Sequence, residues 1–230
     1  MPRILVEVIV RTVADARAAT EGGADRLEVV RAIRDGGLTP ARDLVAAIAR
    51  ATSLPLRVML RENAGYDTSL AELDVLRSAA AGFANLGVSG LVAGFARAGR
   101  PLLDELSTVI EAAPGVPVTF HRAFDSLADP LGAIDRISRV PPVDRILASG
   151  GKGSATERCE ALRAYAEHAT GRLTIIAGGG VDAEMFATLV RAGAVNEVHV
   201  GRAARDGRDA EGPVSAVSVR RLRDLADRHA

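Results

Sequence analysis

The sequence has very little cysteine: Cys159 is the only one in 230 residues. One thiol cannot form a disulfide within the chain, and it cannot supply a zinc or iron–sulfur site that needs several cysteines. A chain without structural disulfides is compatible with a reducing compartment.

The sequence also lacks an excess of charge and any long apolar run. Its 29 Lys and Arg residues balance 29 Asp and Glu residues, whereas a general nucleic-acid binder carries a basic excess. No apolar run approaches the roughly 18 residues that cross a bilayer. The first residues place Glu7 inside an apolar stretch and show no signal-peptide cleavage pattern. We therefore expect neither nucleic acid nor membrane as a partner.

The composition that remains is that of a globular protein. Hydrophobic residues make up 48% of the chain and charged residues 25%. A chain of this length buries a full core without a disulfide or metal, and it is short for two domains. We predict one domain over residues 1–230.

Short apolar runs alternate with helical patterns along the whole chain. The runs are aliphatic or β-branched and end at Gly, Pro, Asp or Ser, as expected of strands that are covered on both faces. The predicted strands are 4–10, 26–30, 56–61, 90–95, 117–124, 145–149, 174–177 and 197–200. Eight strand–helix alternations favour an α/β fold of the (β/α)8 TIM-barrel type. The alternative is an open doubly wound sheet, which usually has fewer strands.

Several of the predicted helices begin with a recognisable capping signal. Thr39 and Asp129 each precede a proline, which suits an N-cap followed by the first helical position. Ser69 and Ser154 are each followed three residues later by a glutamate, which is the capping-box pattern.

Two carboxylates lie inside predicted strands. Glu7 and Glu28 interrupt the first two apolar runs, where a buried charge is costly unless it is paired or hydrogen-bonded. In a barrel these strands are neighbours, so the two acids share a small volume, which raises one pKa and suits acid–base chemistry or cation binding. The alternative is that each acid is paired with an arginine in the barrel core.

The ends of the third and fifth strands carry further polar residues. Arg61 ends the third strand, where it can balance the two acids, clamp an anion or reach solvent. Strand alternation places His121 inward and Arg122 on the opposite face. Arg122 and Asp125, which follow at the end of this strand, are candidate substrate-binding residues together with Arg61. An inward His121 is a candidate general acid or base near neutral pH.

Glycine-rich loops follow the last three predicted strands. Small residues let backbone N–H groups approach an anion, and the loops after strands seven and eight are the usual phosphate site of this fold. The alternative is that the glycines only make tight turns. The candidate ligand-binding residues here are Ser149, Gly150, Gly178, Gly179, Gly180, His199 and Gly201. The polar loop 202–213 lies beside this site and is a candidate cover.

Five segments carry a resemblance to a known family. They are Gly-Ala-Asp-Arg-Leu-Glu at 23–28, Gly-Gly-Leu-Thr-Pro at 36–40, Val-Thr-Phe-His-Arg-Ala-Phe-Asp at 118–125, Ile-Leu-Ala-Ser-Gly at 146–150 and Glu-Val-His at 197–199. In this order they resemble the CutC copper-homeostasis family. The resemblance implies a cytoplasmic TIM-barrel protein with a role in copper handling. Cu(I) prefers thiolate and thioether ligands, and the first two strands contain no cysteine, so direct Cu(I) binding is not expected.

Two functions from different classes remain open at this stage. The first is copper handling, with copper implied by the family alone. The second is an enzyme in which Glu7, Glu28 and His121 transfer protons while Arg61 and the glycine loops hold a small anionic or phosphorylated substrate. A binding protein without turnover is a third alternative. The sequence leaves open a divalent ion between the two acids and a homo-oligomeric state.

Overall fold

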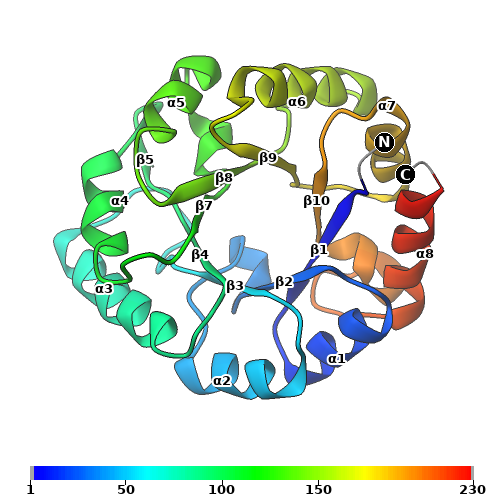
Figure 1. Cartoon of the computed structure of the whole chain (residues 1–230), viewed down its shortest axis with the longest axis horizontal. Helices are drawn as coiled ribbons and strands as arrows, with labels where there is room; N and C mark the ends of the chain where they lie inside the picture. The colour runs from blue at the N-terminus through cyan, green and yellow to red at the C-terminus, as the bar shows by residue number, and fades with distance from the viewer. Residues whose placement is uncertain (1–2, 229–230) are drawn as a thin grey trace.

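The computed structural model describes residues 3–228, and its central feature is a closed barrel of eight parallel strands (Figure 1). The order around the barrel is β1-β10-β9-β8-β7-β4-β3-β2. The strands are β1 Leu5–Val10, β2 Arg26–Val29, β3 Leu56–Met59, β4 Gly90–Ala93, β7 Val118–Phe120, β8 Val143–Ala148, β9 Thr174–Ala177 and β10 Glu197–Val200. The predicted (β/α)8 barrel is confirmed.

Eight α-helices form a ring around the barrel (Figure 1). They are α1 Val13–Glu21, α2 Arg42–Ala51, α3 Leu70–Ala84, α4 Leu103–Ile110, α5 Pro130–Ile137, α6 Ala155–Ala169, α7 Ala183–Ala192 and α8 Ala216–Asp227. Among the described residues, no helix is both long enough and apolar enough to cross a bilayer.

The strand alternation sorts side chains into two environments. Val6, Val8 and Val10 of β1 are fully buried in the main core between the barrel and its helices. The alternate residues point into the barrel, where Val30, Met59 and their neighbours form a separate small apolar cluster. The inward positions therefore decide what the barrel mouth can do.

The helix starts mostly follow the capping signals. Capping boxes are present at Ser69 and Ser154, and the Asp129 side chain accepts the Gly132 N–H before α5. The prediction for Thr39 is wrong, because α2 begins three residues later at Arg42. The Thr39 hydroxyl instead accepts the Arg61 N–H at 2.9 Å and joins two loops at the barrel mouth.

The fifth predicted strand is shorter than the sequence indicated. β7 ends at Phe120, and Arg122–Ser126 form a short 3-10 helix, η2, in which the N–H of the second residue, Ala123, donates to the His121 ring. The change of backbone cancels the strand alternation after His121, so Arg122 turns toward the barrel mouth. A small hairpin of β5, Ala96–Arg97, and β6, Arg100–Pro101, was not predicted.

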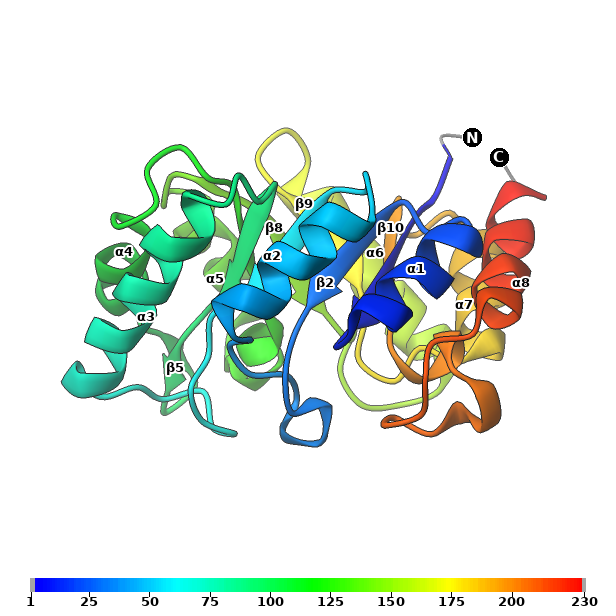
Figure 2. The ribbon, with the colours of Figure 1, turned by 90° about the horizontal axis from the view of Figure 1, so that it is seen from below.

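The loops at the carboxyl ends of the strands gather at one end of the barrel. Figure 2 shows the loops after β2, β3 and β10 together at the lower edge. The loop after β2 contains the 3-10 helix η1, Ile33–Asp35, and the loop after β10 contains η3, Arg202–Ala204, and η4, Asp206–Arg208. These loops frame the site described next.

Candidate functional site

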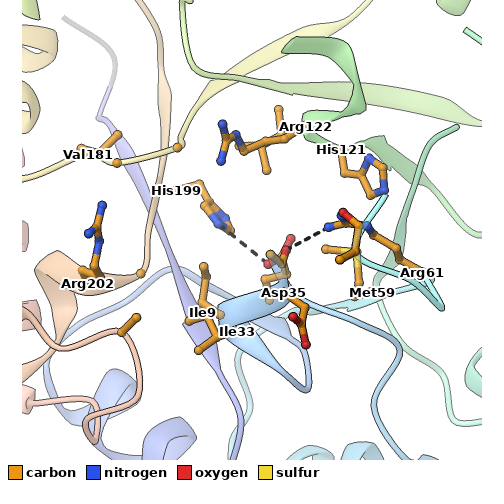
Figure 3. Close-up of a pocket in the computed structure, with 18 of the residues that line it drawn as sticks. Ile9, Ile33, Asp35, Met59, Arg61, His121, Arg122, Val181, His199 and Arg202 are labelled. Atoms are coloured by element: carbon orange, nitrogen blue, oxygen red, sulfur yellow. Dashed lines mark hydrogen bonds and ion pairs between the residues drawn. The ribbon is translucent and has the colours of Figure 1, made fainter. Parts of the chain in front are cut away.

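A cavity of about 350 Å³ opens at the carboxyl end of the barrel (Figure 3). Its wall comes from seven of the eight strand ends and from the loops after them. The lining residues are Ile9, Glu28, Ile33, Asp35, Gly36, Met59, Arg61, Ala64, Tyr66, His121, Arg122, Leu147, Gly179, Gly180, Val181, His199, Gly201, Arg202 and Ala210. Eight of the thirteen predicted site residues are in this set: Glu28, Arg61, His121, Arg122, Gly179, Gly180, His199 and Gly201.

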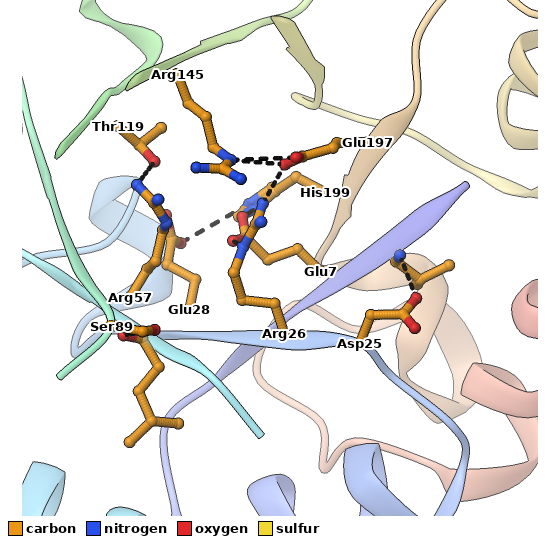
Figure 4. Close-up of polar contacts among 12 residues, drawn as sticks. Glu7, Asp25, Arg26, Glu28, Arg57, Ser89, Thr119, Arg145, Glu197 and His199 are labelled. Atoms are coloured by element: carbon orange, nitrogen blue, oxygen red, sulfur yellow. Dashed lines mark hydrogen bonds and ion pairs between the residues drawn. The ribbon is translucent and has the colours of Figure 1, made fainter. Parts of the chain in front are cut away.

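Glu7 lies below the cavity as the buried partner of an arginine. Parallel pairing places it beside both Arg26 of β2 and His199 of β10. Its carboxylate accepts a hydrogen bond from Arg26 Nε and forms a 2.8 Å contact with His199 Nδ1 (Figure 4). Burial alone would raise the pKa of Glu7, but Arg26 and His199 hold it well below its usual range. Glu7 is therefore a fixed anion.

His199 connects this fixed anion to the cavity. Its Nδ1 faces Glu7, and its Nε2 lies 3.8 Å from Glu28 Oε2. Burial alone would lower the pKa of His199, but the Glu28 and Glu7 carboxylates raise it above its usual value. The contact with Glu7 assigns a proton to Nδ1, so Nε2 is the nitrogen that exchanges protons with the cavity side.

Glu28 is the carboxyl group of the pair that stays close to neutral. Its side chain is only 3% exposed, and Oε1 has no hydrogen-bond partner within residues 3–228. Its pKa is raised to about 7, because burial and the nearby Glu7 carboxylate outweigh the opposing charges of His199 and Arg26. A carboxyl group with this pKa changes its protonation state around neutral pH.

The charges beneath the cavity are otherwise balanced (Figure 4). Arg26 bridges Glu7 and Glu197, and Arg145 contacts Glu197 at 3.0 Å. Arg57 pairs with Asp144 at 2.8 Å and donates to Thr119. Each of these guanidinium groups thus has a carboxylate partner, and none of them forms an ion pair with Glu28. Arg26 acts on Glu28 and His199 only at longer range, where its charge lowers the pKa of both groups. The pair is neutral overall when it holds one exchangeable proton, on either the carboxyl group or the imidazole.

His121 lies in the cavity wall in its neutral form. Burial, together with the positive charge of Arg61, lowers its pKa to about 3. Its Nδ1 accepts the Ala123 N–H at 3.1 Å, so the ring proton lies on Nε2. Nε2 is buried and has no partner among the described residues. His121 is therefore a hydrogen-bond donor in this structure, not the general base that its strand-end position suggested.

Arg61 does not balance the two acids, contrary to one of the alternatives from the sequence. Its guanidinium donates to the carbonyls of Ala64, Gly65 and, at 3.4 Å, Gly36, and it lies 4.8 Å from the centre of the Tyr66 ring. It has no carboxylate partner in the described part of the chain. The alternative that Arg61 reaches solvent also fails, because its side chain is buried.

The glycines after β9 lie between two arginines. A Cβ at Gly179 would lie 2.7 Å from Arg122 Nε, and a Cβ at Gly180 would lie 3.8 Å from Arg202 Nη2. Both glycines line the cavity and have a positive φ, a conformation that glycine adopts without steric cost. The absence of side chains thus lets two guanidinium groups and the loop backbone approach one point.

The loop after β10 contributes to this wall. Arg202 and Ala210 line the cavity, as expected of a segment beside the site. Arg205 fastens the loop because its guanidinium donates to the carbonyls of Gly201, Ile9 and Gly212 at 2.8 to 3.1 Å.

Five predicted residues do not line the cavity, of which Glu7 is described above. Asp125 pairs with Arg122 and accepts the Ser149 N–H at 2.8 Å. Gly150 lies against the backbone of α6, where a Cβ would come within 2.3 Å of the Arg158 carbonyl oxygen. Gly178 lies against Leu147 and His199. In the structure these residues shape the loops, which was the alternative stated for the glycines.

The sequence reasoning missed much of the apolar wall and the third loop. Ile9, Met59 and Leu147 are ordinary strand residues whose inward position only the register reveals. Tyr66 lies in an irregular loop, and its ring contacts that of His121 with 5.6 Å between centroids. Irregular loops have no periodic signal, so its place in the cavity was not predictable.

Comparison with known proteins agrees with this architecture. The profile of the CutC family matches residues 4–204. The CutC family protein of Caulobacter vibrioides is 38% identical over 201 residues, which cover 86% of this chain and 80% of that protein. The chain belongs to the CutC family. The CutC family protein of Pasteurella multocida is 32% identical over 197 residues, which cover 85% of this chain and 80% of its own.

Solved structures show the same fold. A CutC protein of Streptococcus agalactiae superimposes with a TM-score of 0.78 at 23% identity, covering 85% of this chain and 97% of its own. The thiamine phosphate pyrophosphorylase of Pyrococcus furiosus gives a TM-score of 0.63 at 16% identity, covering 98% of this chain and 96% of its own. At these identities the likeness extends to the barrel alone.

The residues of this chain do not fit a Cu(I) site at the barrel mouth. Within the described residues, Met59 is the one sulfur-bearing residue that lines the cavity, and Cys159 is buried on α6 outside the barrel. One ligand atom each from Glu7, Glu28 and His199 lies within 4.8 Å of the others, but these are oxygen and nitrogen donors. Such donors suit harder cations than Cu(I). In addition, Glu7 is already engaged by Arg26 and His199.

Proposed function

We propose that this CutC family member is an enzyme that performs acid–base chemistry on a small anionic molecule at the barrel mouth. The observation that carries the proposal is the buried Glu28 carboxyl group, whose pKa is raised to about 7 beside His199 in the wall of a cavity. A group with a pKa near the working pH is suited to both taking and giving a proton.

The proton-transfer roles follow from the contacts. Glu28 takes a proton from a substrate carbon or oxygen, and His199 Nε2 returns a proton on the same side of the cavity. Glu7 does not line the cavity, so we assign it the role of a positioning residue that fixes the His199 ring through Nδ1. Arg26 in turn keeps Glu7 ionised.

The substrate class follows from the opposite wall. Arg122 and Arg202 flank Gly179 and Gly180, and no carboxylate within residues 3–228 pairs with Arg202. Guanidinium groups beside open backbone are typical of phosphate and carboxylate sites. A cavity of about 350 Å³ is at the small end of the range for ligand sites, which favours a small anionic or phosphorylated metabolite.

Proton exchange with solvent tests the proposal. A panel of small phosphorylated and carboxylated carbonyl compounds is incubated with the protein in D2O, and loss of the hydrogen next to the carbonyl is followed by proton NMR. We expect exchange with at least one compound and a loss of about 100-fold or more in Glu28→Gln, as for removal of a general base. Glu160→Gln, an exposed glutamate on α6, is the matched control. Equal exchange in Glu28→Gln contradicts the proposal, as does a panel in which no compound exchanges or raises the melting temperature.

Copper handling is the second candidate, and its support comes from the name of a relative. The Streptococcus agalactiae protein with the same fold is called a copper homeostasis protein. The cavity of this chain offers Met59 but no thiolate among the described residues, so we expect any role in copper handling to be indirect. Titration with Cu(I) against a competing chelator tests this. Tight stoichiometric binding that survives Cys159→Ser would establish a copper site that the donor set does not predict. The cytoplasmic location and the oligomeric state stay predictions.

A further inference from the structure

The cavity wall opposite Arg202 contains two donor groups that the protein itself leaves incompletely used. Arg61 is a buried guanidinium whose neighbours are carbonyl oxygens rather than a carboxylate. His121 carries its proton on Nε2, and this buried N–H has no acceptor among the described residues. A buried donor without a partner is destabilising, so a ligand atom that accepts a hydrogen bond from it is favoured.

These two groups belong to one cluster. Tyr66 lies between them, with its ring 4.8 Å from the Arg61 guanidinium carbon and 5.6 Å from the His121 ring. In Figure 3, His121 and Arg61 lie on one side of the cavity and Arg202 on the other, with His199 between them. His199 of the proton-transfer pair thus lies between two regions of positive or donor character.

We propose that the His121–Arg61 wall is an acceptor subsite, which binds a carbonyl or carboxylate oxygen of a ligand whose other end is the anion held beside Gly179 and Gly180. This inference rests on the proposed function and narrows its substrate to molecules with two separated oxygen-rich ends. A carbonyl oxygen placed here would be polarised by the His121 N–H, which increases the acidity of the neighbouring carbon–hydrogen bond.

Two matched ligands allow the contributions of the two ends of the site to binding to be measured separately. 2-Phosphoglycolate and ethyl phosphate share a phosphate group, but only the former carries a carboxylate at the other end. By isothermal titration calorimetry we expect the wild-type protein to bind 2-phosphoglycolate about tenfold more tightly than ethyl phosphate, the ratio that one hydrogen bond to a charged acceptor supplies.

Two substitutions of the histidine distinguish ligand binding from a structural role. The Asn side chain of His121→Asn can still accept the Ala123 N–H in place of Nδ1, but it does not reach the position of Nε2. The longer His121→Gln places an N–H donor near the Nε2 position. We expect the preference for 2-phosphoglycolate to disappear in His121→Asn and to return in part in His121→Gln. If His121 had only a structural role, His121→Gln would be the more damaging substitution, because His121→Asn keeps the acceptor for the Ala123 N–H. The ratio of the affinities for 2-phosphoglycolate and ethyl phosphate would then not change in either variant.

Arg202→Met is the control for the opposite end of the site. It should weaken both ligands equally and leave their ratio unchanged, because both carry the phosphate group. Equal affinity of the two ligands for the wild-type protein overturns the acceptor subsite while leaving the proposed function intact. If neither ligand nor inorganic phosphate binds, the anion site itself fails, and the proposed function fails with the subsite.

Discussion

The raised pKa of Glu28 makes the stability of the fold depend on pH in a defined direction. In the unfolded chain this carboxyl group loses its proton near its ordinary pKa of 4.5, whereas in the folded protein it does so near 7. Between these values the folded protein binds more protons than the unfolded chain, so stability falls as the pH rises and the loss is complete above pH 7. A difference of this size corresponds to about 3 kcal/mol.

Glu28→Gln removes this dependence because the amide does not titrate. His199 acts in the same direction, since its raised pKa also gives stability that is lost as the pH rises, and Glu28 is one cause of that rise. The wild-type protein therefore loses stability as the pH rises from 4.5 to 8, and the variant does not lose this part. We expect the free energy of unfolding of the variant, relative to that of the wild-type protein, to increase by about 3 kcal/mol over this pH range, whatever the difference is at pH 4.5.

Urea denaturation at several pH values between 4.5 and 8 measures this difference. Unfolding is followed by far-ultraviolet circular dichroism because the chain contains no tryptophan. Glu160→Gln, an exposed change of the same chemistry on α6, should run parallel to the wild-type protein. If Glu28→Gln also runs parallel, Glu28 has an ordinary pKa in the folded state, and the argument for a neutral carboxyl group in the cavity wall is refuted.

Two further predictions concern the parts of the site around this group. Arg26→Met leaves Glu7 as a buried carboxylate without its main counter-charge. We expect urea denaturation at pH 7 to show a loss of roughly 3–5 kcal/mol in the free energy of unfolding. A loss below about 1 kcal/mol would contradict the assigned pairing. Gly179→Ala places a methyl group against Arg122 and should weaken binding of inorganic phosphate several-fold by calorimetry. Gly87→Ala is its control, because Gly87 also has a positive φ but a Cβ added there meets no atom within 4 Å. If both variants bind phosphate equally well, Arg122 is not part of the anion site.

The barrel was predictable because each of its strands is buried on both faces. Apolar runs such as that around Val6 and Val8 are short, β-branched and separated by capped helices, and this combination has few other solutions. The Thr39 prediction failed because its hydroxyl pairs with the end of β3, a tertiary contact that a local capping pattern cannot reveal.

The candidate site was predictable where a charge interrupts an apolar strand. Glu7 and Glu28 were found for this reason, and pairing with an arginine, one of the stated alternatives, holds for Glu7 but not for Glu28 within the described residues. The identity of that arginine was not predictable, because the register between β1 and β2 decides that Arg26 lies beside Glu7. Arg122 was assigned to the wrong face because β7 stops two residues before it.

The central claim is that Glu28 and His199 share one exchangeable proton near neutral pH. Carbon-13 NMR of protein labelled at the glutamate carboxyl carbons measures it directly, with the Glu28 signal assigned by its absence in Glu28→Gln. If the proton is shared in this way, that signal titrates with a midpoint near pH 7. A midpoint near 4.5 would contradict it, because Glu28 would then be an ordinary carboxylate at the pH where the protein works.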